Sequence, residues 1–138
     1  MTFKKPSDFG GGSYFKPKEH GNDLALLVEP RSINKDVPNT YQGRTTMRDE
    51  AVCDITVFGT SEALDKGTPT LVMSGVKVVH GMLSSTCERT IGEAFVARVD
   101  RIQTQNGSGY VWRDVDPEVE SKVGAYYEAR NTEPSFDD

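Results

Sequence analysis

Hydrophobic and polar residues alternate along several segments of the chain, which is the pattern of a strand that buries one face. The clearest segment is AVCDITVF, residues 51–58. Its odd-numbered positions, from Ala51 to Val57, are expected on one face of the strand, and its even-numbered positions, from Val52 to Phe58, on the other. Similar apolar or alternating runs predict four more strands, over residues 23–31, 70–79, 93–103 and 110–115.

Two other segments have the three-to-four-residue spacing of a helix. Apolar residues from Met82 to Ile91 predict a short helix that ends at Gly92. A final helix is expected after its capping residue Asp116, with Pro117 at the first helical position. The two helices therefore follow the third and the fifth predicted strands.

The segments between these elements are rich in turn-forming residues. Residues 32–50 are polar and contain Pro38, Asn39 and Gly43, so we expect a long loop there. An Asn-Gly pair at 106–107 predicts a hairpin turn between the last two strands.

This order of elements predicts a mainly β fold. Five strands, with a short helix between the third and fourth and a C-terminal helix, match the OB-fold, a five-stranded, partly open Greek-key barrel. A β-sandwich with peripheral helices is the alternative. We expect a basic arm rich in Gly, Pro and aromatic residues over 1–21, an OB-fold-like domain over 22–130 and an acidic, disordered tail over 131–138.

Charge divides the chain into two unequal parts. The 138 residues carry a net charge of −5, but residues 1–113 sum to +1 and residues 114–138 to −6. Such asymmetry is typical of an interaction tail on a binding domain, and also of a tail that only aids solubility. No apolar run reaches the ~20 residues of a transmembrane helix, and the first residues lack the apolar core of a secretory signal. Cys53 and Cys87 have no paired spacing, so we expect reduced thiols in a cytosolic protein.

The common catalytic and metal-binding motifs are missing from the sequence. His20 and His80 have no partner at metal-ligand spacing, and neither CxxC nor HxxxH occurs. The GGGS at 10–13 is not followed by the GK[ST] of a phosphate-binding loop, and there is no GxSxG. We therefore expect a protein that is not an enzyme and that needs no metal or cofactor.

Aromatic and basic residues are instead interleaved in three places: the N-terminal arm, the polar segment 32–50 and the last two strands. Rings that stack on bases, beside cations that meet phosphates, are what a sequence-tolerant single-strand binder requires. The candidates for stacking are Tyr14, Phe15, Tyr41 and Trp112. The candidates for phosphate contacts are Lys16, Lys18, Arg44, Arg48, Arg98 and Arg113. Tyr110 and Trp112 are two apart and so share a face, which is either the DNA-binding face or the core.

Three stretches of the chain resemble phage-encoded single-stranded DNA-binding proteins of the kind found in actinobacteriophage genomes. They are the opening MTFKKPSDFGGGSYFKP, the segment GVKVVHGMLSSTCERTIGEAFVARV and the segment YVWRDVDPEV. The resemblance implies an OB-fold that coats and protects single-stranded DNA during phage DNA replication and recombination, in the cytoplasm of the infected bacterial host. It leaves open whether the protein is a homo-oligomer and whether it prefers DNA to RNA.

The last residues, EPSFDD, are similar in style to the acidic, Phe-bearing tails by which bacterial and phage single-strand binders recruit replication or recombination proteins. The resemblance assigns partner binding to Glu133, Phe136, Asp137 and Asp138. Many such tails end on the aromatic residue, whereas here two aspartates follow it, which argues against capture of ring and terminal carboxylate together.

Two other classes of function fit the same sequence. One is a virion structural or decoration protein built on a β-barrel. The other is a host-interaction module whose acidic end imitates nucleic acid. The charge of only +1 on residues 1–113 keeps both alternatives open, because strong DNA binders usually carry more surplus positive charge.

Overall fold

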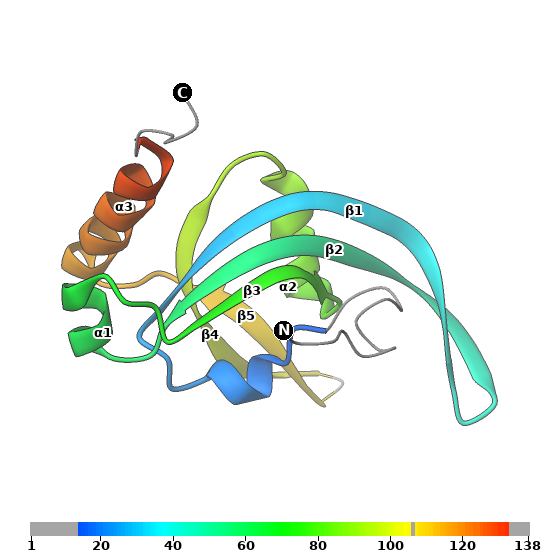
Figure 1. Cartoon of the computed structure of the whole chain (residues 1–138). Helices are drawn as coiled ribbons and strands as arrows, with labels where there is room; N and C mark the ends of the chain where they lie inside the picture. The colour runs from blue at the N-terminus through cyan, green and yellow to red at the C-terminus, as the bar shows by residue number, and fades with distance from the viewer. Residues whose placement is uncertain (1–13, 106, 133–138) are drawn as a thin grey trace, which may run out of the picture.

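The computed structural model describes residues 14–105 and 107–132. Within them, five antiparallel strands form a curled, half-barrel sheet accompanied by three α-helices (Figure 1). The strands are β1 (Ala25–Tyr41), β2 (Arg44–Phe58), β3 (Leu71–Val78), β4 (Phe95–Thr104) and β5 (Gly107–Arg113). The helices are α1 (Ser61–Lys66), α2 (Gly81–Arg89) and α3 (Pro117–Thr132), with a short 3-10 helix, η2, at Pro17–His20. The expected mainly β fold, the helix between the third and fourth strands and the C-terminal helix are confirmed.

The strands lie in the order β3-β2-β1-β4-β5 in a single sheet, so the alternative of a two-sheet sandwich is wrong. β1 is the central strand, but it pairs with β4 only at Leu26, Leu27 and Val28. β3 and β5 are the outer strands. At the free edge of β3, Tyr14 forms a parallel bridge with Lys77, and the Phe15 amide donates to the Lys77 carbonyl at 2.8 Å. The following helix η2 contacts β4, so residues 14–20 run from β3 toward the other half of the sheet.

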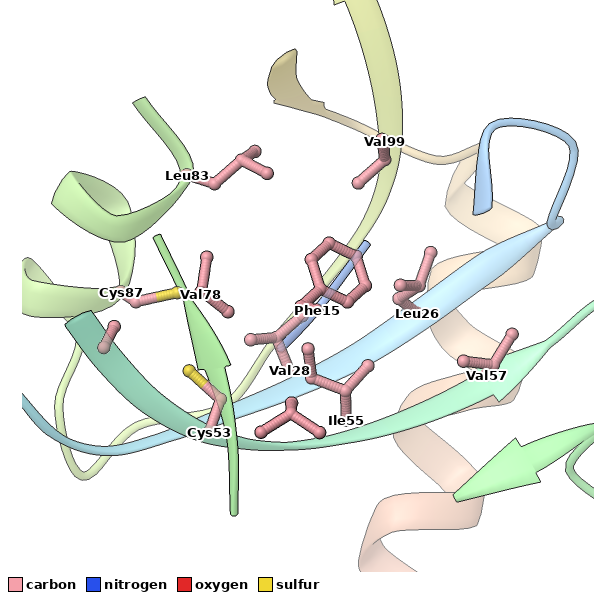
Figure 2. Close-up of a cluster of buried hydrophobic side chains, with 12 residues drawn as sticks. Phe15, Leu26, Val28, Cys53, Ile55, Val57, Val78, Leu83, Cys87 and Val99 are labelled. Atoms are coloured by element: carbon pink, nitrogen blue, oxygen red, sulfur yellow. The ribbon is translucent and has the colours of Figure 1, made fainter. Parts of the chain in front are cut away.

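The main core fills the concave side of the curl. Its central ring is Phe15, and residues from all the surrounding elements pack near it, among them Leu26, Ile55, Leu83 and Val99 (Figure 2). The alternation predicted for residues 51–58 is confirmed, since the odd-numbered positions belong to this cluster. Burial of these apolar side chains is the principal force that holds the half-barrel closed.

A second, smaller core lies on the other face of the sheet. Leu27 of β1 and Phe58 of β2 pack there against Leu64 of α1 and Val123 of α3. The ring of Tyr126 meets Phe58 edge-on, with 5.2 Å between the ring centres. Helices α1 and α3 therefore cover the end of the sheet that lies away from the β1–β2 turn (Figure 1).

The long loop predicted over residues 32–50 is wrong. Nearly all of this segment is strand, and β1 and β2 continue as a long hairpin that extends beyond the rest of the sheet (Figure 1). Tyr41 pairs with Arg44, so the turn has two residues, Gln42 and Gly43, with φ of 51° and 77°. Two positive φ values define a type I′ turn, whose twist suits a hairpin but which usually carries Asn-Gly.

Helix α1 lies between the second and third predicted strands, where the sequence pattern indicates no helix. The Thr60 hydroxyl caps it by accepting from the Ala63 amide at 3.1 Å, and Gly67 ends it in the left-handed region at φ 66°. The expected boundary between arm and domain at residues 21–22 also differs from the fold, because Phe15 belongs to the main core.

None of the helices in the described part of the chain is both long enough and apolar enough to span a membrane.

Candidate functional site

A groove forms where residues 14–19 cross the end of β3 and approach β5. Its volume is about 380 Å³, which is in the range of small ligand sites. The buried Phe15 ring forms part of its floor. We call it the aromatic–basic groove and define it by the exposed or half-buried rings and cations that line it: Tyr14, Lys16, Lys18, Arg48, His80 and Tyr110. Four of these six residues were predicted from the sequence as DNA contacts, and the fold brings them together from the arm and from β2.

Tyr14 is the most prominent ring of the groove. It is 45% exposed, because strand-like alternation directs its neighbour Phe15 into the core and Tyr14 outward. The Arg48 guanidinium lies 5.4 Å from the centre of the ring and the Lys77 ammonium 5.5 Å. These are cation–π distances, so the ring is held in place by two positive charges.

A buried carboxylate organises the cations under Tyr14. Glu50 is only 3% exposed, and its oxygens lie 3.5 Å from Arg48 Nη2 and 3.5 Å from Lys77 Nζ. The Tyr14 hydroxyl also donates to Glu50, at 3.5 Å. Two cations against one carboxylate leave a net positive charge. The buried Nε of Arg48 has no hydrogen-bond partner in the part of the chain that the structure describes.

His80 and Tyr110 form the opposite wall of the groove. His80 precedes the first turn of α2, and Tyr110 lies on β5. Their rings meet edge-on, with 5.2 Å between centres and 71° between planes. Partial burial lowers the pKa of the His80 imidazole, and the Arg48 guanidinium lowers it further, so the ring is neutral at physiological pH. The wall therefore presents two uncharged rings.

Lys16 and Lys18 supply exposed positive charge at the rim. Both side chains are exposed, and neither forms an ion pair within residues 14–105 and 107–132. Glu19 lies beside them and brings one carboxylate to the groove. An exposed, unpaired ammonium gives up little when it meets a phosphate, because no existing ion pair has to be broken.

Arg98 and Arg113 do not belong to the groove. Strand register pairs Arg98 with Arg113 and Val99 with Trp112, so the two arginines lie on the face of the β4–β5 ribbon opposite to Trp112. Arg113 is also engaged, since its Nε lies 3.2 Å from Asp100. Because adjacent positions on a strand point to opposite faces, the phosphate contacts predicted for Arg98 and Arg113 would lie on the face of the ribbon away from Tyr110 and Trp112.

Arg44 and Tyr41 lie at the far end of the β1–β2 hairpin, paired in register beside the turn. Arg44, Thr46 and Arg48 alternate along β2 and therefore share one of its faces. The hairpin thus extends the Arg48 side of the groove away from the body of the fold.

Phe15 is a core residue, which is not compatible with the stacking role expected for it. It is 1% exposed, and its ring stacks on His20 at 5.1 Å and on Trp112 at 5.8 Å. Trp112 is partly buried, its indole N–H donates to the Leu83 carbonyl at 3.1 Å, and Phe95 meets it edge-on at 5.4 Å. Of the two alternatives that the sequence left for Trp112, its contacts favour the core.

Of the groove residues, only His80 is not indicated as a DNA contact by the sequence, which leaves Tyr110 open between the DNA-binding face and the core. The alternation of Tyr110 with Trp112 indicates a shared face, whereas the residues around His80 give no sign of a DNA contact. The four tail residues Glu133, Phe136, Asp137 and Asp138 lie outside the described residues. Among the residues described, no three His, Cys, Asp or Glu side chains are grouped as a metal site would require.

Comparisons with protein-family models, with curated proteins and with solved structures gave no match.

Proposed function

We propose that this protein binds single-stranded DNA, without sequence preference, through the aromatic–basic groove. The observation that carries the proposal is the meeting of exposed or half-buried rings and unpaired cations in one groove. Tyr14 and Tyr110 offer faces on which bases stack, and Lys16 and Lys18 offer charge to the phosphates. Stacking on a ring tolerates any base, which is why this chemistry gives affinity without sequence readout.

We further propose that the half-barrel is an OB-fold. The strand order β3-β2-β1-β4-β5, with α2 between β3 and β4, fits a five-stranded Greek-key barrel left open between β3 and β5. OB-folds bind nucleic acids over the face of their second and third strands and the adjoining loops. The aromatic–basic groove lies beside the same two strands, because Arg48 is on β2 and Tyr14 pairs with Lys77 of β3.

The weak overall charge of the chain is compatible with this function. Single-strand binding needs local charge along one path rather than a large net charge, and each phosphate that is neutralised contributes a slope of about −0.7 to log K against log salt. A few groove cations therefore predict a modest salt dependence, with stacking supplying much of the affinity.

The proposal is tested by fluorescence anisotropy with labelled oligo(dT) and two matched double variants. Lys16→Ala/Lys18→Ala and Arg98→Ala/Arg113→Ala remove the same charge from opposite faces. The first should reduce the salt slope by about 1.4, at about 0.7 per contact, and the second should leave it nearly unchanged. Tyr14→Ala and Tyr110→Ala should each weaken binding by ~1–3 kcal/mol. The proposed site is refuted if the two double variants reduce the salt slope equally. It is also refuted if the wild-type protein binds duplex DNA as tightly as it binds oligo(dT).

The resemblance extends the proposal to phage DNA replication and recombination in the host cytoplasm, with the acidic tail recruiting partner proteins. The predicted tail, residues 131–138, overlaps α3, which ends at Thr132, so the deletion is limited to residues 133–138. It should tighten oligo(dT) binding at low salt, because it removes tethered negative charge that competes for the groove. The virion alternative predicts large assemblies that do not respond to oligo(dT), so size-exclusion chromatography with and without the oligonucleotide separates it from our proposal.

A further inference from the structure

A second hollow lies between α2 and β5, on the other side of the His80–Tyr110 contact. Its volume is about 500 Å³. Met82, Ser85 and Arg89 line it from α2, and Val111 and Trp112 line it from β5. We call it the α2–β5 groove. Of the DNA contacts predicted from the sequence, Trp112 is the one that lines this groove.

The two grooves are lined by neighbouring residues at the start of α2 and on β5. Their walls are adjacent in sequence on both sides, because Gly81 of one follows His80 of the other and Val111 follows Tyr110. The end of Met82 lies beside Gly109, where a Cβ would come within 3.4 Å of its methyl carbon. A chain leaving the aromatic–basic groove past Tyr110 therefore arrives at Met82.

The α2–β5 groove has the chemistry of a nucleotide site. Met82 is 47% exposed, which is unusual for so apolar a side chain, and the partly buried Trp112 ring lies on the opposite wall. The exposed Met82 side chain offers an apolar surface for a base. Arg89 is exposed at the end of the same helix and forms no ion pair within the described part of the chain.

Arg89 is also held in position. Its Nη1 donates to Ser85 Oγ at 3.1 Å and its Nη2 to Thr86 Oγ1 at 3.4 Å. These neutral partners orient the guanidinium without cancelling its charge, so its full charge and its remaining N–H groups are available to an anion. Planar guanidinium groups are well suited to two-point contact with phosphate oxygens.

We propose that the α2–β5 groove is a second nucleotide subsite, in which a single strand that leaves the aromatic–basic groove places a base against Met82 and a phosphate on Arg89. This inference rests on the proposed function, since the strand must first occupy the aromatic–basic groove. In this arrangement the DNA contacts α2 as well as the face formed by β2 and β3.

The test is a length series of labelled oligo(dT) with two matched single variants. Arg89→Ala removes the proposed contact, and Arg98→Ala removes one exposed arginine, also without an ion pair in the described part, from the opposite face of the β4–β5 ribbon. For strands of about 12 nucleotides, Arg89→Ala should lower affinity about fivefold at 0.1 M salt and reduce the salt slope by about 0.7. Strands of about 4 nucleotides, at the lower end of OB-fold site sizes, should bind as before. Arg98→Ala should change neither.

Arg89→Lys provides the positive control, since it keeps the charge and should retain the slope on long strands. A melting curve by circular dichroism checks that each variant is folded. If Arg89→Ala leaves long strands unaffected, or weakens short and long strands equally, the second subsite is refuted while the proposed function stands. If wild-type protein binds no oligo(dT) of any length, the proposed function itself fails.

Discussion

Replacing Trp112, the single tryptophan of the chain, by alanine separates a role in the fold from a role in stacking on DNA. The structure ties this ring to its surroundings by three contacts: a stack on Phe15, an edge-on contact with Phe95 and an indole hydrogen bond to the Leu83 carbonyl. We therefore expect Trp112→Ala to lower the free energy of unfolding much more than it lowers the affinity for DNA.

The magnitude follows from these contacts. Two aromatic pairs at about 0.5–1.5 kcal/mol each and one hydrogen bond at about 1 kcal/mol give a loss of about 2–4 kcal/mol on Trp112→Ala. Full truncation of a completely buried tryptophan costs about 3–5 kcal/mol, and Trp112 is only partly buried. Trp112→Phe keeps the ring contacts and loses the N–H donor, so it should cost about 1 kcal/mol.

Urea denaturation followed by far-ultraviolet circular dichroism measures both losses without using tryptophan emission. Oligo(dT) affinity is then measured by anisotropy in buffer in which both variants are folded. A structural role for Trp112 is refuted if Trp112→Ala leaves the urea midpoint unchanged and weakens oligo(dT) binding by ~1–3 kcal/mol, the value of a lost stacking contact. That result would return Trp112 to the DNA-binding face.

Three further predictions concern other parts of the fold. The neighbouring Cys87 thiol and burial raise the pKa of Cys53, and both sulfurs are enclosed, so Ellman's reagent should label neither thiol until urea unfolds the protein. The pKa of His80 in the folded protein lies below its ordinary value of 6.5. As the pH falls below 6.5, the imidazole is therefore protonated in the unfolded chain before it is protonated in the folded protein. Stability should therefore fall there, while oligo(dT) affinity should rise, and His80→Gln should remove both trends. Gln42→Asn should stabilise the type I′ turn by about 0.5 kcal/mol and slow amide exchange in the hairpin, whereas Gly43→Val, at φ 77°, should do the reverse.

The alternation of hydrophobic residues was sufficient to predict the strands that line the main core, and insufficient where the segment is polar on both faces. The β1–β2 hairpin was missed because its outer half buries little, and because Gln42-Gly43 lacks the asparagine that usually marks a type I′ turn. Pro38 also argued for a loop. It is tolerated in β1 because the β1–β4 pairing stops at Val28, which leaves the outer edge of the hairpin without a partner strand.

The membership of the candidate site could be predicted only in part, because it depends on contacts between distant segments. Tyr14, Lys16, Lys18 and Arg48 were proposed from their residue types, but nothing in the sequence indicates that the arm crosses β3 beside Arg48. Phe15 and Tyr14 are adjacent and have the same residue types around them. They differ in direction, since the Phe15 ring points into the core and the Tyr14 ring points into the groove. A sequence pattern gives residue types and their local faces, and the tertiary fold decides which faces meet.

The distribution of ion pairs explains how a nearly neutral body can offer a binding surface for an anion. On the side covered by α1 and α3, basic residues are matched by carboxylates: Lys122 lies 2.6 Å from Asp65, and Arg130 lies 2.8 Å from Glu29. These pairs contribute little to stability individually, but they cancel charge at that end of the molecule. The groove side is different, because one buried carboxylate, Glu50, serves two cations and the rim lysines have no acidic partner within the described residues. Unpaired positive charge and exposed rings therefore meet in the groove, and the net charge of the whole chain does not reveal this local arrangement.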